Sequence, residues 1–94
     1  MFSWDIEKAI LNFEKHGVSF EEAATAFDDE EGLDWADLKH SKSEARRKRL
    51  AESNVSRLLL IVYTVRKETN GNETIRIISA RRASYNERRA YFES

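Results

Sequence analysis

Apolar residues follow two different periods along this chain of 94 residues, and the change of period predicts where helices give way to strands. Helical spacing dominates the first 27 residues, at Ile6, Ala9, Ile10 and Phe13 and again at Phe20, Ala23, Ala24 and Phe27. Asp5 can cap the first helix, and Gly17 can end it in the left-handed conformation. Ser19 and Glu22 have the spacing of a capping box at the start of the second helix. Two helices are therefore predicted, one after Asp5 and one after Ser19.

Runs of branched and aromatic residues then predict the strands of a sheet. The expected strands are Phe2 to Trp4, Leu33 to Ala36, Arg46 to Ser53, Leu58 to Tyr63 and Glu73 to Arg81. Leu58 to Tyr63 is apolar at both parities, so we expect a central strand covered on both faces. The basic strand Arg46 to Ser53 is expected nearer an edge. Asn70-Gly71 predicts a tight hairpin turn before the last strand.

The end of the chain predicts a third helix, because Ser84 and Glu87 have the spacing of another capping box. The element order is then two helices, several strands and a helix. This order predicts an α+β fold, in which two N-terminal helices and one C-terminal helix pack on a small antiparallel sheet. The length suits one domain, which we expect to span residues 1–94.

Composition narrows the possible chemistry. The chain has no cysteine and only two histidines, so disulfides and thiolate metal sites are excluded and no metal or cofactor is expected. Glycine-rich phosphate loops and nucleophile elbows are also missing from the sequence, which gives no support to nucleotide hydrolysis. There is neither a signal-peptide pattern nor a long apolar run, so we expect a soluble, cytoplasmic protein without a membrane partner.

The net charge of −1 hides a strong asymmetry between the two halves of the chain. Residues 1–44 hold twelve acids and four lysines, a net charge of −8. Residues 45–94 hold five acids and twelve bases, a net charge of +7, and ten of these bases are arginines. Because the guanidinium group binds phosphate through two parallel hydrogen bonds, the second half is a candidate anion-binding surface. Alternatively, acidic helices pair with a basic sheet inside the monomer.

Six arginines lie on or beside the predicted strands, namely Arg46, Arg47, Arg66, Arg76, Arg81 and Arg82. Pairing through the Asn70-Gly71 turn should bring Arg66 close to Arg76. Such like charges are tolerated where they fan into solvent or meet an anion, and phosphate is the common physiological anion. Spacing alone leaves both interpretations open.

Two further groups could assist an anion site. His40 and Glu44 precede the basic strand and are general acid/base types, which RNA cleavage through its own 2′-hydroxyl requires. The simpler interpretation is a surface histidine and a glutamate paired with a neighbouring arginine. Tyr91, on the helix that carries Arg88 and Arg89, could stack on a base, whereas most other aromatic residues are expected in the core.

Taken together, these motifs resemble the BrnT toxin family over nearly the whole chain. The resemblance rests on Phe2-Ser-Trp4-Asp5, Asn12-Phe-Glu-Lys15-His16-Gly17-Val18-Ser19-Phe20-Glu21-Glu22-Ala23, Phe27-Asp28-Asp29, His40-Ser41, Glu44-x-Arg46, Ile75-Arg76-Ile77-Ile78-Ser79-Ala80-Arg81-Arg82-Ala83 and Glu87-Arg88-Arg89-Ala90-Tyr91. It implies the toxin of a bacterial type II toxin–antitoxin pair, with a fold similar to RelE-type toxins. It also implies metal-independent RNA cleavage that arrests translation, and a DNA-binding antitoxin of the BrnA type as partner.

The resemblance also suggests roles for single residues. Arg81 would bind and stabilise the scissile phosphate, helped by Arg66, Arg76 and Arg46, with His40 and Glu44 and, after them, Tyr91 as acid/base candidates. The charge of the second half, rather than the resemblance, makes Arg47, Arg82, Arg88 and Arg89 expected RNA contacts, together with Tyr91. The strand Arg46 to Ala51 departs from the family pattern, which leaves open which of its side chains face the site. The alternative is a non-catalytic module that acts on operator DNA only in complex with an antitoxin.

Overall fold

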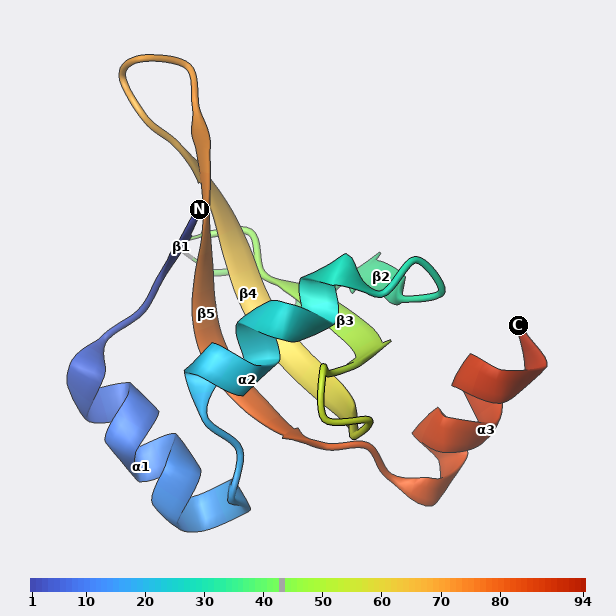
Figure 1. Cartoon of the computed structure of the whole chain (residues 1–94). Coiled ribbons are helices and arrows are strands. Elements are labelled where there is room, and N and C mark those ends of the chain that lie inside the picture. Colours follow the sequence, from blue (N-terminus) through green and yellow to red (C-terminus); the bar gives the residue numbers. More distant parts are fainter. Residues whose placement is uncertain (43) are drawn as a thin grey trace.

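The computed structural model describes residues 1–42 and 44–94 and shows helices packed on a five-stranded sheet (Figure 1). The elements in chain order are β1 (Phe2–Ser3), α1 (Ile6–His16), α2 (Phe20–Thr25), the 3-10 turn η1 (Ala26–Asp28), β2 (Leu33–Ala36), the 3-10 turn η2 (Leu38–His40), β3 (Arg47–Glu52), β4 (Leu58–Lys67), β5 (Glu73–Arg82) and α3 (Tyr85–Glu93). The predicted α+β class is confirmed. In the described part of the chain, no helix has both the length and the apolar character needed to cross a membrane.

The strand order is β1-β5-β4-β3-β2, so β4 is the central strand, as its apolar sequence predicts. Strands β2 to β5 pair antiparallel. Strand β1 instead runs parallel to β5, with Phe2 opposite Ile75, so the sheet is mixed rather than wholly antiparallel. Parallel strands need a long connection between them, and the chain between β1 and β5 is long enough to provide one. A tight hairpin can join only antiparallel strands.

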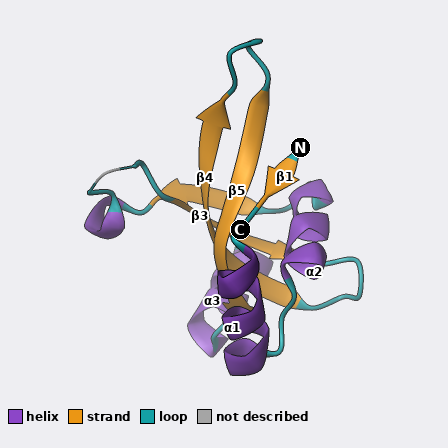
Figure 2. Cartoon of the chain, turned by 90° about the vertical axis from the view of Figure 1, so that its left-hand side faces the viewer, coloured by secondary structure: helices purple, strands orange, loops and turns teal. Residues whose placement is uncertain are grey.

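The two faces of the sheet are covered unequally. Helices α1 and α2 lie on one side, called here the helix-covered face, over a core that includes Phe20, Leu59 and Ile61. The other side is the open face, and α3 covers only one end of it, where Tyr91 packs against a cluster that includes Leu60. Figure 2 shows the short turn η2 standing on the opposite side of the sheet from α2.

The predicted helix ends are confirmed by their capping bonds. The Asp5 carboxylate accepts from the backbone N–H of Lys8 at 3.2 Å, and Gly17 adopts the left-handed conformation at φ 69°. Ser84 and Glu87 form the complete capping box at the start of α3. In α2 only half of the predicted box forms, because the Glu22 carboxylate binds other side chains instead.

Helix α1 contacts the sheet in an unexpected way. Its buried residue is Asn12, whose amide donates to the carbonyls of Val18 at 3.0 Å and Ala80 at 2.8 Å. The Asn12 side-chain oxygen also accepts from the Ala80 N–H at 3.1 Å. A buried amide is stable when its donors and acceptor are satisfied in this way. This polar clamp ties α1 to β5, and of the apolar stripe only Ala9 packs against the core, whereas Ile6, Ile10 and Phe13 stay exposed.

Candidate active site

Strand β3 divides its basic residues between the two faces because side chains alternate along a strand. On the helix-covered face, Arg49 is buried and donates to the Ala26 carbonyl at 3.1 Å, the Asp29 carbonyl at 2.6 Å and the Asp34 carboxylate at 2.5 Å. Arg47, an expected RNA contact, lies on this same face. Its Nε donates to the Tyr63 hydroxyl at 3.3 Å, so Arg47 is remote from the basic group on the open face.

The open face carries a pocket of about 250 Å³, called here the open-face pocket. Its lining comprises Asp37, His40, Arg46, Lys48, Leu60, Val62, Ser79 and Arg81. Three strands and one turn meet here, because β3, β4 and β5 supply the floor and the segment around η2 supplies the wall. The lining combines three permanent cations with one histidine, which is the inventory needed to bind and transform an anion.

A carboxylate holds the histidine in this pocket. His40 Nδ1 lies 3.2 Å from an Asp37 carboxylate oxygen, and the Asp37 side chain is only 7% exposed against 59% for His40. The Asp37 backbone is fixed in turn, since its N–H donates to the Arg46 carbonyl at 2.8 Å and its carbonyl accepts from the Ser41 hydroxyl at 2.6 Å. With Nδ1 engaged, Nε2 is the ring nitrogen left for a substrate.

Arg81 enters the pocket from β5 with its guanidinium already oriented. Its two terminal nitrogens donate to the two carboxylate oxygens of Glu87 at 2.8 and 2.9 Å. These hydrogen bonds lower the pKa of the Glu87 carboxyl and raise the pKa of Arg81, because each charge stabilises the other. Glu87 also accepts from the Ser84 N–H in the α3 capping box, so the start of α3 fixes Arg81.

Arg66 and Arg76 lie on the open face further along β4 and β5. Arg76 is opposite Thr64 and Arg66 is opposite Thr74, so the two arginines are diagonal neighbours on adjacent strands. The proximity expected from the hairpin is therefore found. Arg66 donates from Nε to Glu44 at 2.8 Å, a hydrogen bond that lowers the pKa of the Glu44 carboxyl. Glu44 is thus ionised at neutral pH and suited to accept a proton or a hydrogen bond rather than to donate one.

A β-bulge determines that Arg76 and Arg81 share a face. In a regular strand, residues five positions apart point to opposite faces. Here Val62 pairs with Ser79 and Tyr63 pairs with Ile77, so Ile78 is the extra residue of a bulge. The bulge resets the alternation, and both arginines point to the open face.

Helix α3 places the remaining candidates outside the pocket. The Tyr91 hydroxyl donates to the Asp29 carboxylate at 2.6 Å, which raises the pKa of Tyr91 to about 12. The side chain thereby anchors α3 to the sheet instead of offering a free stacking surface. Arg88 lies over the Phe92 ring and Arg89 bonds to Glu93 at 3.1 Å.

Arg82 is exposed and lies on the opposite side from Arg81. There the hydrogen bond from Arg57 lowers the pKa of Glu22, and the charge of Arg82 adds to this effect. The structure thus brings together His40, Arg46 and Arg81, with Arg66 and Arg76 as a second group on the same face. Glu44 joins the two groups, because it bonds to Arg66 and lines a further pocket with His40 and Arg46. Arg47 and Arg82 fall on the other face.

Three polar pocket residues were missed by reasoning from the sequence, namely Asp37, Lys48 and Ser79. Asp37 could have been found from its spacing to His40, because residues three apart in a helical turn share a side. Lys48 and Ser79 carry no such signal, since only the strand register places them. Among the described residues, no group of three or more histidine or acidic side chains is placed to hold a metal ion.

Fold and pocket together define a small α+β protein with a cationic, histidine-containing surface site, which is suited to a phosphodiester substrate. A family model described as "Ribonuclease toxin, BrnT, of type II toxin-antitoxin system" matches residues 4–87. The chain therefore belongs to the BrnT family of ribonuclease toxins.

Comparison with solved structures agrees with this assignment at the level of the fold. The crystal structure of the Brucella abortus ribonuclease toxin BrnT is similar with a TM-score of 0.62 at 21% sequence identity. The match covers 89% of this chain and 97% of that chain. No curated protein matches the chain.

Proposed function

We propose that this BrnT-family chain is a metal-independent endoribonuclease and that the open-face pocket is its active site. The observation that carries the proposal is the position of His40, which Asp37 holds in the same pocket as Arg46, Lys48 and Arg81. A solvated basic surface requires no proton-transfer group among its cations, whereas an RNA-cleaving site does. Membership of a ribonuclease toxin family supports the same choice.

The reaction we propose is attack of the ribose 2′-hydroxyl on the adjacent phosphorus. The bond from O2′ to phosphorus forms as the bond from phosphorus to O5′ breaks, leaving a 2′,3′-cyclic phosphate and a 5′-hydroxyl. His40 Nε2 takes the proton of the 2′-hydroxyl, the departing O5′ takes a proton from water, and the hydroxide that remains takes the proton back from His40. Arg81 stabilises the negative charge that builds up on the phosphate oxygens, with Arg46 and Lys48 beside it.

Arg66 and Arg76 extend this cationic surface along the β4–β5 ribbon, and we assign them to the flanking phosphates of the RNA strand. Glu44 balances Arg66 in the free protein. An incoming phosphate can replace this carboxylate, because the ion pair is largely exposed and such pairs contribute little to stability.

The partner we propose is a DNA-binding antitoxin of the BrnA type, as type II membership implies an antitoxin. Operator DNA would be bound only through that complex. RNA cleavage in the cytoplasm would arrest translation when the antitoxin is lost.

The decisive experiment incubates the purified protein with single-stranded RNA in EDTA. We expect fragments that end in cyclic phosphate or 3′-phosphate, and we expect Arg81→Ala to lose about 100- to 1,000-fold in rate, the usual cost of removing one donor to a developing oxyanion. Arg82→Ala is the matched control, since Arg82 is the adjacent arginine on the other side of the sheet. Circular dichroism checks that both variants fold. Intact RNA in the presence of folded wild-type protein would overturn the enzyme proposal in favour of a non-catalytic nucleic-acid-binding module.

A further inference from the structure

Helix α1 presents its apolar stripe to solvent. Ile6, Ile10 and Phe13 lie one turn apart along the helix, and they are 69%, 56% and 55% exposed. A different side of the helix carries Asn12, which clamps α1 to β5. Fully burying one such side chain is worth about 1.5 to 3 kcal/mol, so this fold leaves a considerable stabilisation unused.

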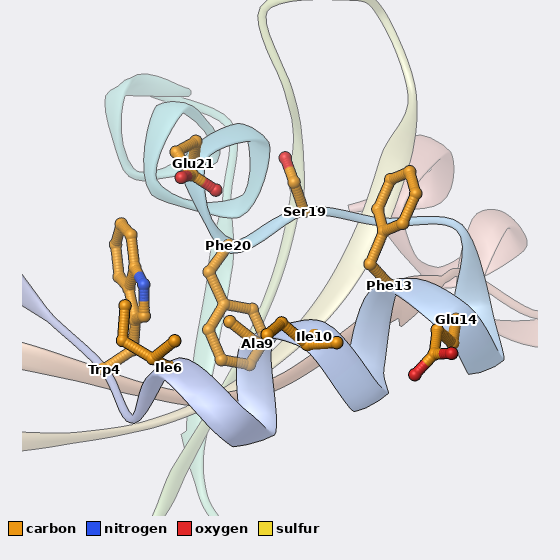
Figure 3. A pocket seen from close by; sticks show the side chains of 9 residues that line it. All are labelled: Trp4, Ile6, Ala9, Ile10, Phe13, Glu14, Ser19, Phe20 and Glu21. Atoms are coloured by element: carbon orange, nitrogen blue, oxygen red, sulfur yellow. The ribbon is translucent and has the colours of Figure 1, made fainter.

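These side chains border an apolar groove of about 350 Å³ between α1 and α2, called here the α1–α2 groove (Figure 3). Ile6, Ile10 and Phe13 line it from α1, and Trp4 closes one end. Phe20 of α2 is fully buried beneath it and meets the Trp4 ring edge-on at 6.0 Å between centroids. Because these aromatic rings already support each other, the groove exists before anything binds.

Charge around the groove indicates what fits it. Glu14 and Glu21 are its charged lining residues, and both are exposed. Glu22 and Glu87 are paired with Arg57 and Arg81, whereas Glu14 and Glu21 form no salt bridge with any of the residues that the structure describes. A partner segment with apolar residues in its centre and basic residues at its flanks would therefore match the groove.

We infer that the α1–α2 groove binds an amphipathic helix of the antitoxin, with apolar anchors at helical spacing and lysine or arginine beside them. This inference rests on the proposed function, since it takes the partner to be the antitoxin of the pair. The groove lies on the helix-covered side, away from the open-face pocket. Binding there anchors the antitoxin without occupying the residues that contact RNA.

The test compares two substitutions on the same helix. Ile10→Lys places a cation in the groove, whereas Leu11→Lys places one at a position that is 64% exposed and outside it. The probe is the antitoxin encoded by the reading frame adjoining this gene, titrated calorimetrically into each purified variant. We expect Ile10→Lys to raise the Kd at least 30-fold, as loss of a central apolar anchor does, and Leu11→Lys to change it less than twofold.

A second variant tests the charge argument. Glu14→Lys combined with Glu21→Lys should weaken binding at low salt and reduce the salt dependence of the Kd, because the basic flanks then lose their partners. Both sites are exposed, so the fold should tolerate the change.

Equal affinity of the antitoxin for Ile10→Lys and Leu11→Lys would overturn the inference. The groove would instead bind a second copy of the chain if the wild-type protein is dimeric without antitoxin and the Ile10→Lys variant is monomeric. In that case the variant would still bind the antitoxin with normal affinity. Cleavage of RNA by the same variants without antitoxin keeps the two proposals separate. Ile10→Lys should cleave at the wild-type rate. If the wild-type protein does not cleave RNA, the proposed function is wrong, but the titration with antitoxin still tests whether the groove binds it.

Discussion

Basic side chains occur on both the helix-covered face and the open face, but they have different roles on the two faces. On the helix-covered face two arginines have structural partners, as Arg49 bonds to Asp34 and Arg57 to Glu22. On the open face Arg46, Lys48 and Arg81 converge on a pocket beside a histidine. Position relative to the sheet, and not residue type, separates structural cations from candidate functional ones.

The contrast is sharpest between consecutive residues of β3. Arg49 is buried among two carbonyls and a carboxylate, and a side chain added at Gly32 would collide with its guanidinium. Lys48 points the other way and lines the open-face pocket. Replacing either residue should therefore affect a different property of the protein.

The largest expected effect is the loss of stability in Arg49→Leu. Removing the guanidinium leaves Asp34 without its ion-pair partner and two carbonyls without donors, which should lower the free energy of unfolding by about 3 to 5 kcal/mol. Chemical denaturation measures the change. Lys48→Leu is the matched control and should stay within about 0.5 kcal/mol of wild type while losing RNA cleavage. Equal destabilisation by the two variants would contradict the assignment of faces.

The next effect concerns the histidine of the open face. His40→Ala should slow RNA cleavage by about 100-fold or more, because it removes the group proposed to move a proton. Asp37→Asn should slow cleavage less, since it changes the orientation of the imidazole rather than removing it. His16→Ala is the control, because His16 ends α1 far from the pocket lining. Rates are measured on a fixed RNA under single-turnover conditions.

Tyr91→Phe probes the one end of the open face that α3 closes. Loss of the hydrogen bond to the Asp29 carboxylate should cost about 1.5 to 3 kcal/mol of stability and leave cleavage by the folded protein unchanged.

The same bond predicts a pH dependence. The pKa of Tyr91 is raised from 10.0 to about 12, so its contribution is complete below pH 10 and is lost as the pH rises through 12. Wild-type stability should fall more steeply in this range than that of Tyr91→Phe, as measured by unfolding at several pH values. Parallel profiles would show that Tyr91 does not hold α3.

The smallest effect is expected for Glu87→Gln, which removes the charge that orients Arg81. We expect a loss of about 0.5 to 1 kcal/mol at neutral pH, because the ion pair is partly exposed. The lowered pKa of Glu87 means that its stabilisation is present above the ordinary value of 4.5 and is lost as the pH falls below it. Glu87→Gln should therefore flatten the acid limb of the stability profile. Glu93→Gln, in an exposed pair of the same helix, is the control and should not.

Much of the fold follows from local signals in the sequence. Caps at Asp5 and Ser84 place helix starts, and the doubly apolar run from Leu58 places the central strand. Parallel pairing of β1 with β5 could not be predicted in the same way, because the two strands are more than 70 residues apart and share no turn. The apolar stripe of α1 predicts the helix correctly, but it does not predict which side of the helix contacts the sheet.

The site was predicted less completely than the fold. Arg81, Arg46 and His40 could be singled out from residue type and from resemblance to the family, and the structure places them in one pocket. Asp37 was missed because its role depends on a 3-10 turn that carries His40 back onto it. The RNA role expected for Arg47 rested on charge alone, and charge does not say which face a side chain occupies.

By itself, the sequence determined the elements, their caps and the concentration of arginines in the second half of the chain, because these depend on neighbouring residues. The tertiary structure alone decided which face of the sheet each arginine occupies. A bulge at Ile78 brings Arg76 and Arg81 onto one face, and the β3 register sends Arg49 into the interior and Lys48 to the pocket. Side chains alternate at every residue of a strand, so a shift of one position exchanges a structural cation for one that faces a substrate.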